Sequence, residues 1–360
     1  MQNFPQSDYI ELSKKRNHSE QYIDLVSQYV NNLTCNGYPV IFSLKHLSRI
    51  IGMTYYELIN IIEGREYNYI NYEISKKSGG KRLLTCPNWK LKNIQKWINN
   101  EILMNYKLSS CCTGFRKGMS IKQNAEIHLN QPYILKLDLL DFFPSINEYR
   151  VYNAFKKMGY HTNLSVYLAK LVTVDVGKVY THDFESSPRI IGVGVLPQGS
   201  PTSPYLANII ASKLDERLSK LSKKLNICYS RYADDITFSG ELDKFPSLKL
   251  LNKIIEECGF KINYKKVSLQ NKKQGQIITG LSLSNGVKIP KKYKKETSKH
   301  LYYCKKYGVF GHLAYMKKNK NIDYNGFREW LLGRIYYINS VEPDVAKKML
   351  EDFNTIEWLF

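Results

Sequence analysis

The sequence lacks the cysteine patterns that bind zinc or build a disulfide framework. Its seven cysteines include no Cys-x-x-Cys pair and no regular spacing with histidine, which argues against a zinc ribbon and against a small secreted fold. No run reaches the roughly 18 apolar residues of a membrane span, and the polar first 17 residues contain no apolar signal-peptide core. We therefore expect a cytoplasmic protein with reduced thiols and no membrane partner.

Acidic residues are few relative to basic ones. Lys plus Arg number 53 and Asp plus Glu number 32, which gives a net charge of +21. A charge of this size favours polyanionic partners, because phosphate contacts release counterions; the alternative is a basic surface that only aids solubility. The 28 tyrosines suit base stacking as well as packing in cores. The composition therefore favours nucleic acid as the partner.

There is no internal repeat at a solenoid period and no extended low-complexity tract. Apolar residues at helical spacing predict helices, and alternating apolar residues predict strands. The predicted helices are residues 20–34, 43–63, 88–105, 147–157, 164–174, 205–224 and 248–258. The predicted strands form a hairpin with a basic tip within 67–85 and further strands at 133–137, 227–231 and 236–239. This mixture predicts an α+β fold with helices packed on one face of a sheet.

Asp234 and Asp235 lie side by side between the two apolar runs of the predicted central hairpin. Such a pair is often only a surface turn, because Asp favours turns. Here both flanking strands are apolar, so the carboxylates lie where charge is costly unless a cation is bound. The context favours a metal site over a plain turn.

Asp138 follows another apolar strand and precedes aromatic residues and a proline. Three carboxylates from two neighbouring strands can bind two Mg²⁺ ions roughly 4 Å apart. In such a site one ion activates the attacking hydroxyl, and the other holds the triphosphate and the leaving oxygen. Hard oxygen ligands favour Mg²⁺ or Mn²⁺ over zinc.

A proline-rich loop lies between these acids in the sequence. Residues 196–204 contain three prolines and a glycine, which predicts a rigid loop that leads into a helix. One interpretation is a plain helix entry capped by Thr202 or Ser203. The other is a preorganised loop on which an incoming nucleotide and the template base rest.

Together, these segments resemble a reverse transcriptase. The resemblance rests on Leu137-Asp138 followed by the Phe-Phe-Pro-Ser segment at 142–145, the Leu-Pro-Gln-Gly segment at 196–199, the Tyr-Ala-Asp-Asp segment at 232–235, and the Gly-to-Lys segment at 259–266. All four stand in the order of that family. The resemblance implies a right-hand polymerase, with residues 1–64 as an N-terminal helical extension, 65–132 as fingers, 133–285 as palm with inserts such as 175–195, and 286–360 as a helical, RNA-binding thumb.

Two further segments resemble bacterial retron reverse transcriptases. The Asn-Ala-x-x-His element is present as Asn124 to His128, and Ile278-Thr279-Gly280 stands where those enzymes usually carry Val-Thr-Gly. The resemblance implies structural or RNA-contact roles for Asn124, His128 and Thr279. A group II intron or diversity-generating reverse transcriptase is the alternative enzyme, and a non-catalytic RNA-binding scaffold is the alternative from another class.

The resemblance also implies roles around the nucleotide. Asp138, Asp234, Asp235 and the backbone of Leu139 would hold two Mg²⁺ ions, Mn²⁺ being the alternative. The nucleotide-binding residues implied are Lys81, Arg82, Phe143, Gln198 and Lys265. Phe143 would exclude a ribose 2′-hydroxyl, unless it only packs in the core. Lys81 and Arg82 would clasp the triphosphate, unless they are only solvated, and either Lys265 or Lys266 would lie near the pyrophosphate.

The partners implied are a cognate noncoding RNA, its branched cDNA product, dNTPs and an effector protein. Retron enzymes start cDNA from a 2′-hydroxyl of their own RNA, and the family implies an antiphage defence system. The lysine-rich stretch at 261–306 would grip an A-form duplex by its phosphates and shape. The RNA-binding lysines expected there are Lys288, Lys291, Lys292 and Lys295.

Overall fold

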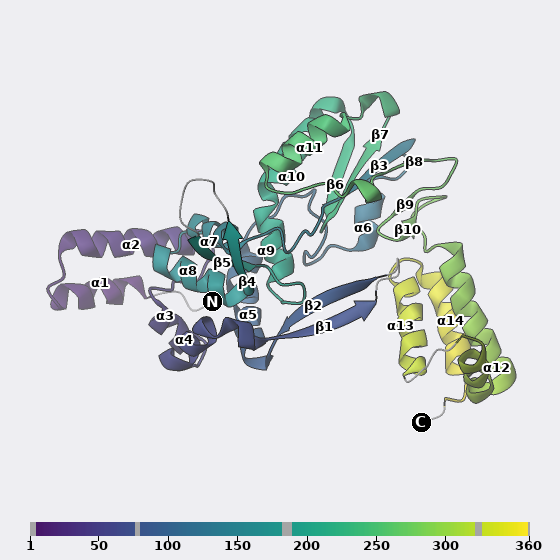
Figure 1. Ribbon diagram of the computed structural model, residues 1–360, viewed down its shortest axis with the longest axis horizontal. Helices are drawn as coiled ribbons and strands as arrows, with labels where there is room; N and C mark the ends of the chain where they lie inside the picture. The colour runs from purple at the N-terminus through teal and green to yellow at the C-terminus, as the bar shows by residue number, and fades with distance from the viewer. Residues whose placement is uncertain (1–4, 76–79, 182–188, 321–325, 359–360) are drawn as a thin grey trace.

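The computed structural model describes residues 5–75, 80–181, 189–320 and 326–358 (Figure 1). The chain opens with four helices, α1 (Gln6–Lys15), α2 (Glu20–Cys35), α3 (Leu44–Ile50) and α4 (Tyr55–Glu63). The single helix predicted over 43–63 is divided in two. Gly52 adopts φ +70°, which ends α3, and Thr54 with Glu57 forms a capping box that starts α4.

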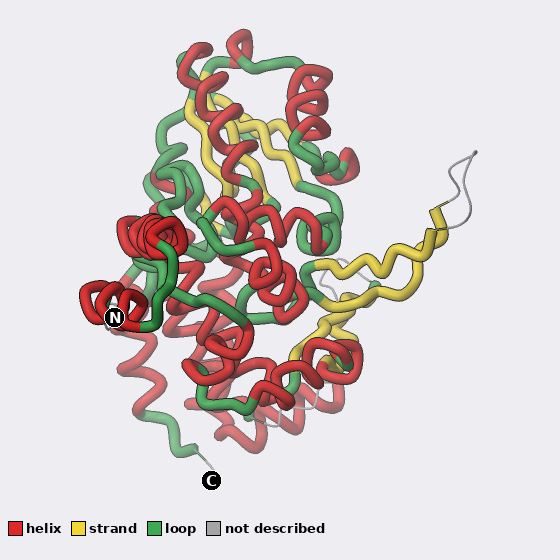
Figure 2. Tube along the Cα trace, turned by 90° about the vertical axis from the view of Figure 1, so that its left-hand side faces the viewer, coloured by secondary structure: helices red, strands yellow, loops and turns green. Residues whose placement is uncertain are grey.

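A two-stranded antiparallel ribbon of β1 (Tyr69–Ser75) and β2 (Lys81–Pro87) follows, as the sequence predicted. It extends away from the body of the molecule (Figure 2). Its base is tied to the proline-rich loop, because the Thr85 amide donates to the Gln198 carbonyl at 2.8 Å. The helix predicted over 88–105 is α5 (Trp89–Trp97), which continues as a π-helical turn (Ile98–Ile102) and a 3₁₀ turn (Leu103–Asn105).

The central sheet has four antiparallel strands in the order β6-β7-β3-β8. They are β3 (Tyr133–Asp138), β6 (Cys228–Tyr232), β7 (Asp235–Gly240) and β8 (Ser268–Asn271). The predicted hairpin is the β6–β7 pair, and β3 lies between β7 and β8. The sheet thus places the ends of β3 and β7 beside each other.

Helices cover both faces of this sheet at β6. Arg231 contacts Asp215 of α10 (Ser212–Leu225), whereas its neighbour Ser230 contacts Asn124 of α6 (Ile121–Glu126). Because alternate side chains of a strand point to opposite faces, α10 and α6 lie on opposite faces. The α11 helix (Leu248–Glu257) packs on α10. The expected helical layer is therefore present, and the short α6 adds cover on the other side.

The remaining elements of the N-terminal body pack around the proline-rich loop. They are α7 (Glu148–Lys157), α8 (Thr162–Val172), β4 (Val174–Thr181), β5 (Arg189–Val195) and α9 (Ser203–Ile210). The insertion predicted over 175–195 forms the antiparallel β4–β5 pair, and its residues 182–188 lie outside the described residues. The helix predicted over 205–224 is divided at Ala211 into α9 and α10.

The C-terminal part consists of the short β9 (Ile277–Ile278) and β10 (Leu281–Ser282) strands followed by α12 (Lys291–Lys320), α13 (Phe327–Asn339) and α14 (Pro343–Asn354). Its hydrophobic cluster includes Ile278 and Leu281 and also takes in Ala125 of α6 and Ile134 of β3. Packing of this part therefore begins before the predicted boundary near residue 285, and the division into fingers, palm and thumb stays a prediction. Within the described ranges, no helix is both long and apolar enough to cross a bilayer.

Candidate active site

Strand pairing brings the three candidate acids together. Asp138 at the end of β3 pairs directly with Asp235 at the start of β7, and Asp234 occupies the adjoining turn. The Leu139 amide donates to the Asp234 carbonyl at 3.0 Å, which joins the two segments just beyond the sheet. A sequence separation of nearly a hundred residues is thus closed by register alone, because directly opposite residues of an antiparallel pair lie within about 5.5 Å.

Asp138 is buried and fully engaged by its neighbours. Asn263 Nδ2 donates to Asp138 Oδ1 at 3.0 Å, and Lys266 Nζ lies 2.7 Å from Asp138 Oδ2. The Asn263 amide also donates to the Asp138 carbonyl at 2.8 Å. The segment at 259–266 therefore folds back onto the first acid and supplies it with a cation.

The other two acids have less compensation. Burial, followed by the charge of Asp234, raises the pKa of Asp235 to about 6 from its ordinary 3.8. Burial is also the largest cause of the raised pKa of Asp234, which Lys266 and Arg82 partly offset. Uncompensated carboxylates that favour protonation are the setting in which a bound cation restores the charged form.

The donor set fits a hard divalent ion, but its oxygens do not yet converge. Among the described residues, no three Asp, Glu, His or Cys side chains are arranged around one point as metal ligands. Lys266 Nζ contacts Asp138 Oδ2 at 2.7 Å, so its ammonium would compete with a bound ion for that oxygen.

The proline-rich loop closes the site on the side of the ribbon. Gly199 adopts φ +138°, and a Cβ there would lie 2.9 Å from both the Thr85 carbonyl oxygen and Cys86 Sγ. Only glycine allows this approach, so the loop is locked to β2. Gln198 is half-buried beside it.

Comparison with known proteins identifies the family. Residues 74–328 match the reverse transcriptase (RNA-dependent DNA polymerase) family. The chain is 31% identical to the retron Ec86 reverse transcriptase of Escherichia coli, over 91% of this chain and 99% of that one. This chain is a retron reverse transcriptase.

Other relatives agree with this assignment. The retron Mx162 enzyme of Myxococcus xanthus is 32% identical over 68% of this chain and 54% of its own. The retron Ec73 enzyme of Escherichia coli is 32% identical over 80% of this chain and 88% of its own. The prediction of a retron reverse transcriptase with a right-hand polymerase fold is confirmed, and the group II intron and non-catalytic alternatives are set aside. Reverse transcriptases use divalent metal ions and copy an RNA template.

In this reverse transcriptase, Lys81 and Arg82 of the ribbon differ in their electrostatic effect on the acids. Lys81 forms an exposed ion pair with Glu73 on the neighbouring strand. Arg82 is exposed, yet its charge offsets part of the raised pKa of Asp234. Arg82 therefore faces the site more directly than Lys81, and nucleotide contacts of both stay predictions.

Phe143 is half-buried in an aromatic row beside the acids. Its ring centroid lies 5.5 Å from that of Phe142 and 6.2 Å from that of Phe115, which in turn lies 6.2 Å from Tyr232. One side of Phe143 thus packs on the core while part of the ring stays accessible. Both expected roles, core packing and exclusion of a 2′-hydroxyl, are compatible with this placement.

The structure distinguishes Lys265 from Lys266 by their contact with the acids, and a contact of either lysine with pyrophosphate stays a prediction. Both lysine side chains are exposed, and Lys266 is the one that contacts Asp138. Residues 264–266 form a 3₁₀ turn, in which successive side chains point about 120° apart, so only one of the two lysines can face Asp138.

The retron-type residues are mostly interior. His128 has no exposed surface, and its two ring nitrogens bond to the Ser239 and Ser230 hydroxyls at 2.7 and 2.8 Å. Asn124 Oδ1 accepts from Thr113 and Ser230. Direct RNA contact by Asn124 and His128 is therefore wrong for this conformation, and the structural role remains. Thr279 is half-buried and donates to the Ile121 carbonyl at 3.3 Å, so its RNA contact stays a prediction.

The expected RNA-binding lysines are exposed. Lys291, Lys292 and Lys295 lie on the first turns of α12, and Lys288 lies just before it. Lys294 differs, because its Nζ lies 2.7 Å from Glu342 Oε1 on the loop before α14. The exposed set remains available to phosphates, whereas Lys294 connects α12 to the rest of the helical unit.

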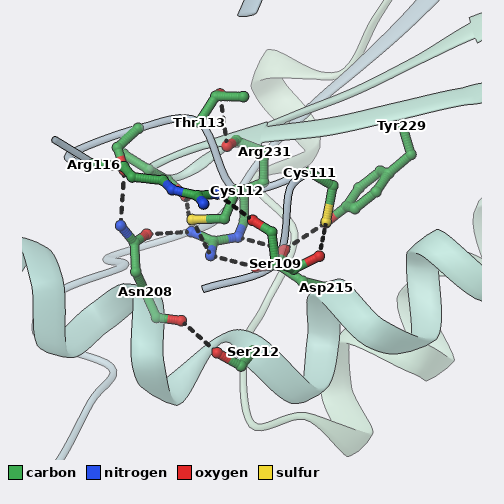
Figure 3. A network of polar contacts seen from close by, with 12 residues as sticks. Ser109, Cys111, Cys112, Thr113, Arg116, Asn208, Ser212, Asp215, Tyr229 and Arg231 are labelled. Atoms are coloured by element: carbon green, nitrogen blue, oxygen red, sulfur yellow. Dashed lines mark hydrogen bonds and ion pairs between the residues drawn. The ribbon is translucent and has the colours of Figure 1, made fainter. Parts of the chain in front are cut away.

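Sequence reasoning missed a buried polar network beneath the acids (Figure 3). Arg231 and Asp215 form an ion pair of 2.7 Å with almost no exposed surface. Removing one member of such a pair typically costs about 3–5 kcal/mol. The only signal in the sequence is an arginine that shares its strand face with Tyr229, an interior position of the alternating pattern.

Proposed function

We propose that this enzyme copies part of a structured noncoding RNA into a branched RNA–DNA, beginning from a 2′-hydroxyl of that RNA. The observation that carries the proposal is the direct pairing of Asp138 with Asp235 beside Asp234. Together with the retron relationship, this arrangement supports a phosphoryl-transfer site of the two-metal class, with Mg²⁺ as the preferred ion and Mn²⁺ as a substitute.

The bound ions would supply Lewis-acid activation of the primer hydroxyl and neutralise the triphosphate. Asp138, Asp234, Asp235 and the Leu139 carbonyl would hold them. Lys266 would leave Asp138 and turn toward the incoming nucleotide, where its ammonium offsets phosphate charge. Gln198 and Phe143 would position the nucleotide sugar, and Arg82 would hold the triphosphate in bidentate fashion.

The C-terminal helices would hold the RNA. Their exposed lysines alternate with exposed tyrosines, including Tyr302, Tyr303 and Tyr307 on α12. Such a surface suits phosphate contact and stacking on unpaired bases. We further propose that the enzyme and its branched product act in an antiphage system with an effector protein, as the retron resemblance implies.

Two experiments test these proposals. Nucleic acid that copurifies with the full chain is digested with RNase and with DNase, and the linkage at the junction is mapped. A DNA strand that keeps a 2′-linked ribonucleotide after RNase treatment is the expected result, and a linear cDNA alone would overturn the priming proposal. Extension assays then compare wild type with a D234N/D235N variant and with a D243N control in an exposed turn. Extension by the double variant at the wild-type rate would overturn the metal assignment.

A further inference from the structure

Arg231 lies on β6 three residues before Asp234 and has no exposed surface. All five N–H groups of its guanidinium have partners. Nε and one Nη2 hydrogen bond go to the two carboxylate oxygens of Asp215, at 2.8 and 2.7 Å. The second Nη2 hydrogen bond goes to Cys112 Sγ at 3.3 Å. Because all five N–H groups of this rigid, planar group are hydrogen-bonded, the guanidinium is fixed in one orientation.

The Nη1 group of Arg231 holds the turn formed by Ala233 and Asp234. It donates to the Ala233 carbonyl and to Asn208 Oδ1, both at 2.9 Å. Ala233 has φ +58°, a left-handed conformation that residues with a Cβ rarely adopt without external support. On the other side of the turn, the Leu139 amide holds the Asp234 carbonyl. The turn that carries both acids is thus fixed by bonds at two successive carbonyls.

The guanidinium of Arg231 also contacts the helix that follows the Leu-Pro-Gln-Gly loop. Asn208 belongs to α9, which starts four residues after Gly199. Its Nδ2 donates to the Gly114 carbonyl at 2.8 Å. Gly114 in turn lies against the turn so closely that a Cβ there would stand 2.5 Å from the Ala233 nitrogen. Arg231 therefore joins the turn that carries the acids to α9 and to the 109–116 loop, and Figure 3 shows its bonds to Asn208 and Cys112.

We propose that Arg231 is a positioning residue for polymerisation: fixed by Asp215 and Asn208, it holds Ala233 in the left-handed conformation that presents Asp234 and Asp235 to the metal ions. This inference rests on the proposed metal role of those acids. In this proposal Arg231 touches neither the substrate nor a metal ion. Its role is to keep Asp234 and Asp235 in the geometry that binds the ions.

A purely structural role is the competing explanation, and the network contains a matched control. Tyr229 donates its hydroxyl to Asp215 Oδ1 at 2.8 Å but does not contact the turn. Y229F removes one bond from the same buried ion pair and leaves Ala233 held. R231K keeps the positive charge beside Asp215, but a single ammonium cannot reach Asp215, Asn208 and Ala233 together.

The test compares these variants by two readouts. Mn²⁺ binding to the full chain is measured by calorimetry without nucleic acid, and single-turnover extension gives the rate and the apparent dNTP affinity. For R231K we expect the Mn²⁺ dissociation constant to rise about fivefold or more and the rate to fall about tenfold, with dNTP affinity changed less than about twofold. Y229F is expected to lower the melting temperature while both readouts stay within about twofold of wild type.

Glycine at position 233 supplies a rescue. Because glycine adopts positive φ without steric cost, R231K/A233G is expected to regain part of the Mn²⁺ affinity lost in R231K. If R231K does not fold, N208A replaces it, because it keeps the ion pair and removes the lateral support of Nη1. Its expected rise in the Mn²⁺ dissociation constant is smaller but exceeds that of Y229F.

Three results would overturn the proposal. The first is a folded R231K or N208A variant whose Mn²⁺ affinity and extension rate equal those of wild type. The second is a Y229F variant that loses as much Mn²⁺ affinity and rate as R231K does. The third is an R231K/A233G variant that binds Mn²⁺ no more tightly than R231K. The calorimetric comparison does not need polymerisation. A wild-type enzyme that binds Mn²⁺ but fails to extend primers would therefore count against the proposed function and leave the role of Arg231 measurable.

Discussion

Neutralising Asp235 should stabilise the metal-free protein and abolish polymerisation. Burial and the adjacent Asp234 raise the pKa of Asp235 to about 6 from 3.8. The folded protein therefore holds this proton more tightly than the unfolded chain does. Between about pH 4 and pH 6 folding takes up a proton, and the stability contributed by the protonated carboxyl is lost as the pH rises through that window.

The pKa shift of Asp235 sets how much its ionised carboxylate destabilises the folded protein. About two pKa units correspond to at most about 3 kcal/mol above pH 6. In D235N the charge is absent, so we expect metal-free D235N to be about 2–3 kcal/mol more stable than wild type near neutral pH. The gain should fade as the pH falls toward and below 4, because the wild-type carboxyl then becomes protonated in the unfolded state as well as in the folded state.

Thermal unfolding in EDTA across this pH range measures the effect. The wild-type curve alone does not isolate Asp235, because burial lowers the pKa of His128 to about 3. A histidine buried in its neutral form loses stability as the pH falls below about 6.5, which is the opposite sign. The difference between D235N and wild type at each pH cancels the histidine contribution, since both proteins contain His128.

A second series with saturating Mn²⁺ completes the test. An ion bound only by the folded state stabilises wild type, so the advantage of D235N should shrink or reverse. D243N, at an exposed acid in the 242–244 turn, is the control and should show neither effect. A D235N variant that is less stable than wild type in EDTA at every pH, or whose gain does not vary with pH, would refute the reasoning.

Three further predictions use other parts of the molecule. Changing Phe143 to Val should raise incorporation of ribonucleotides about tenfold or more in a dNTP–rNTP competition; an unchanged preference in an active variant would assign the ring to packing alone. Replacing Lys288, Lys291, Lys292 and Lys295 with Gln should reduce the log–log salt slope of RNA binding by roughly 0.7–0.9 per lost contact, whereas K249Q/K253Q on α11 should leave it unchanged. H128A should lower unfolding stability by about 1–3 kcal/mol, because the buried hydroxyls of Ser230 and Ser239 each lose their hydrogen bond to the ring, with no change in the salt slope; a reduced slope would restore an RNA contact to this site.

The sequence predicted the strands that carry the acids because their alternation and flanking turns are local signals. Asp138, Asp234 and Asp235 needed only the register of β3 and β7 to meet. Helix divisions at Gly52 and Ala211 were missed, because the apolar periodicity runs on through both positions. The choice between Lys265 and Lys266 depended on the orientation of one 3₁₀ turn, which neighbouring identical residues cannot reveal.

The Arg231 network could not be predicted for a different reason. Its members, Cys112, Asn208, Asp215 and Arg231, come from a loop, two helices and a strand, and nothing in their spacing pairs them. A charged residue on an apolar strand face signals that a partner exists, but only the packing of α10 on β6 identifies it. His128 illustrates the same limit, because its serine partners lie more than a hundred residues away.

Around the central hairpin, the charge of Arg231 is fully paired, whereas the charges of the three acids are not. This contrast supports a metal-centred site. Beneath the turn, the charge of Arg231 is matched by Asp215, and every donor is used. Above it lie three carboxylates. Among the described residues, Lys266 forms an ion pair with one of them, Asp138, and its exposed side chain makes that interaction weak and screened. Since the charge of Arg231 on β6 is fully matched, the weaker compensation of the acids at the ends of β3 and β7 is the setting in which a cation binds. In a chain of net charge +21, this local negative surplus is the feature that a divalent ion would complete, and the rigid arginine beneath would keep its ligands in place while Lys266 exchanges with the ion.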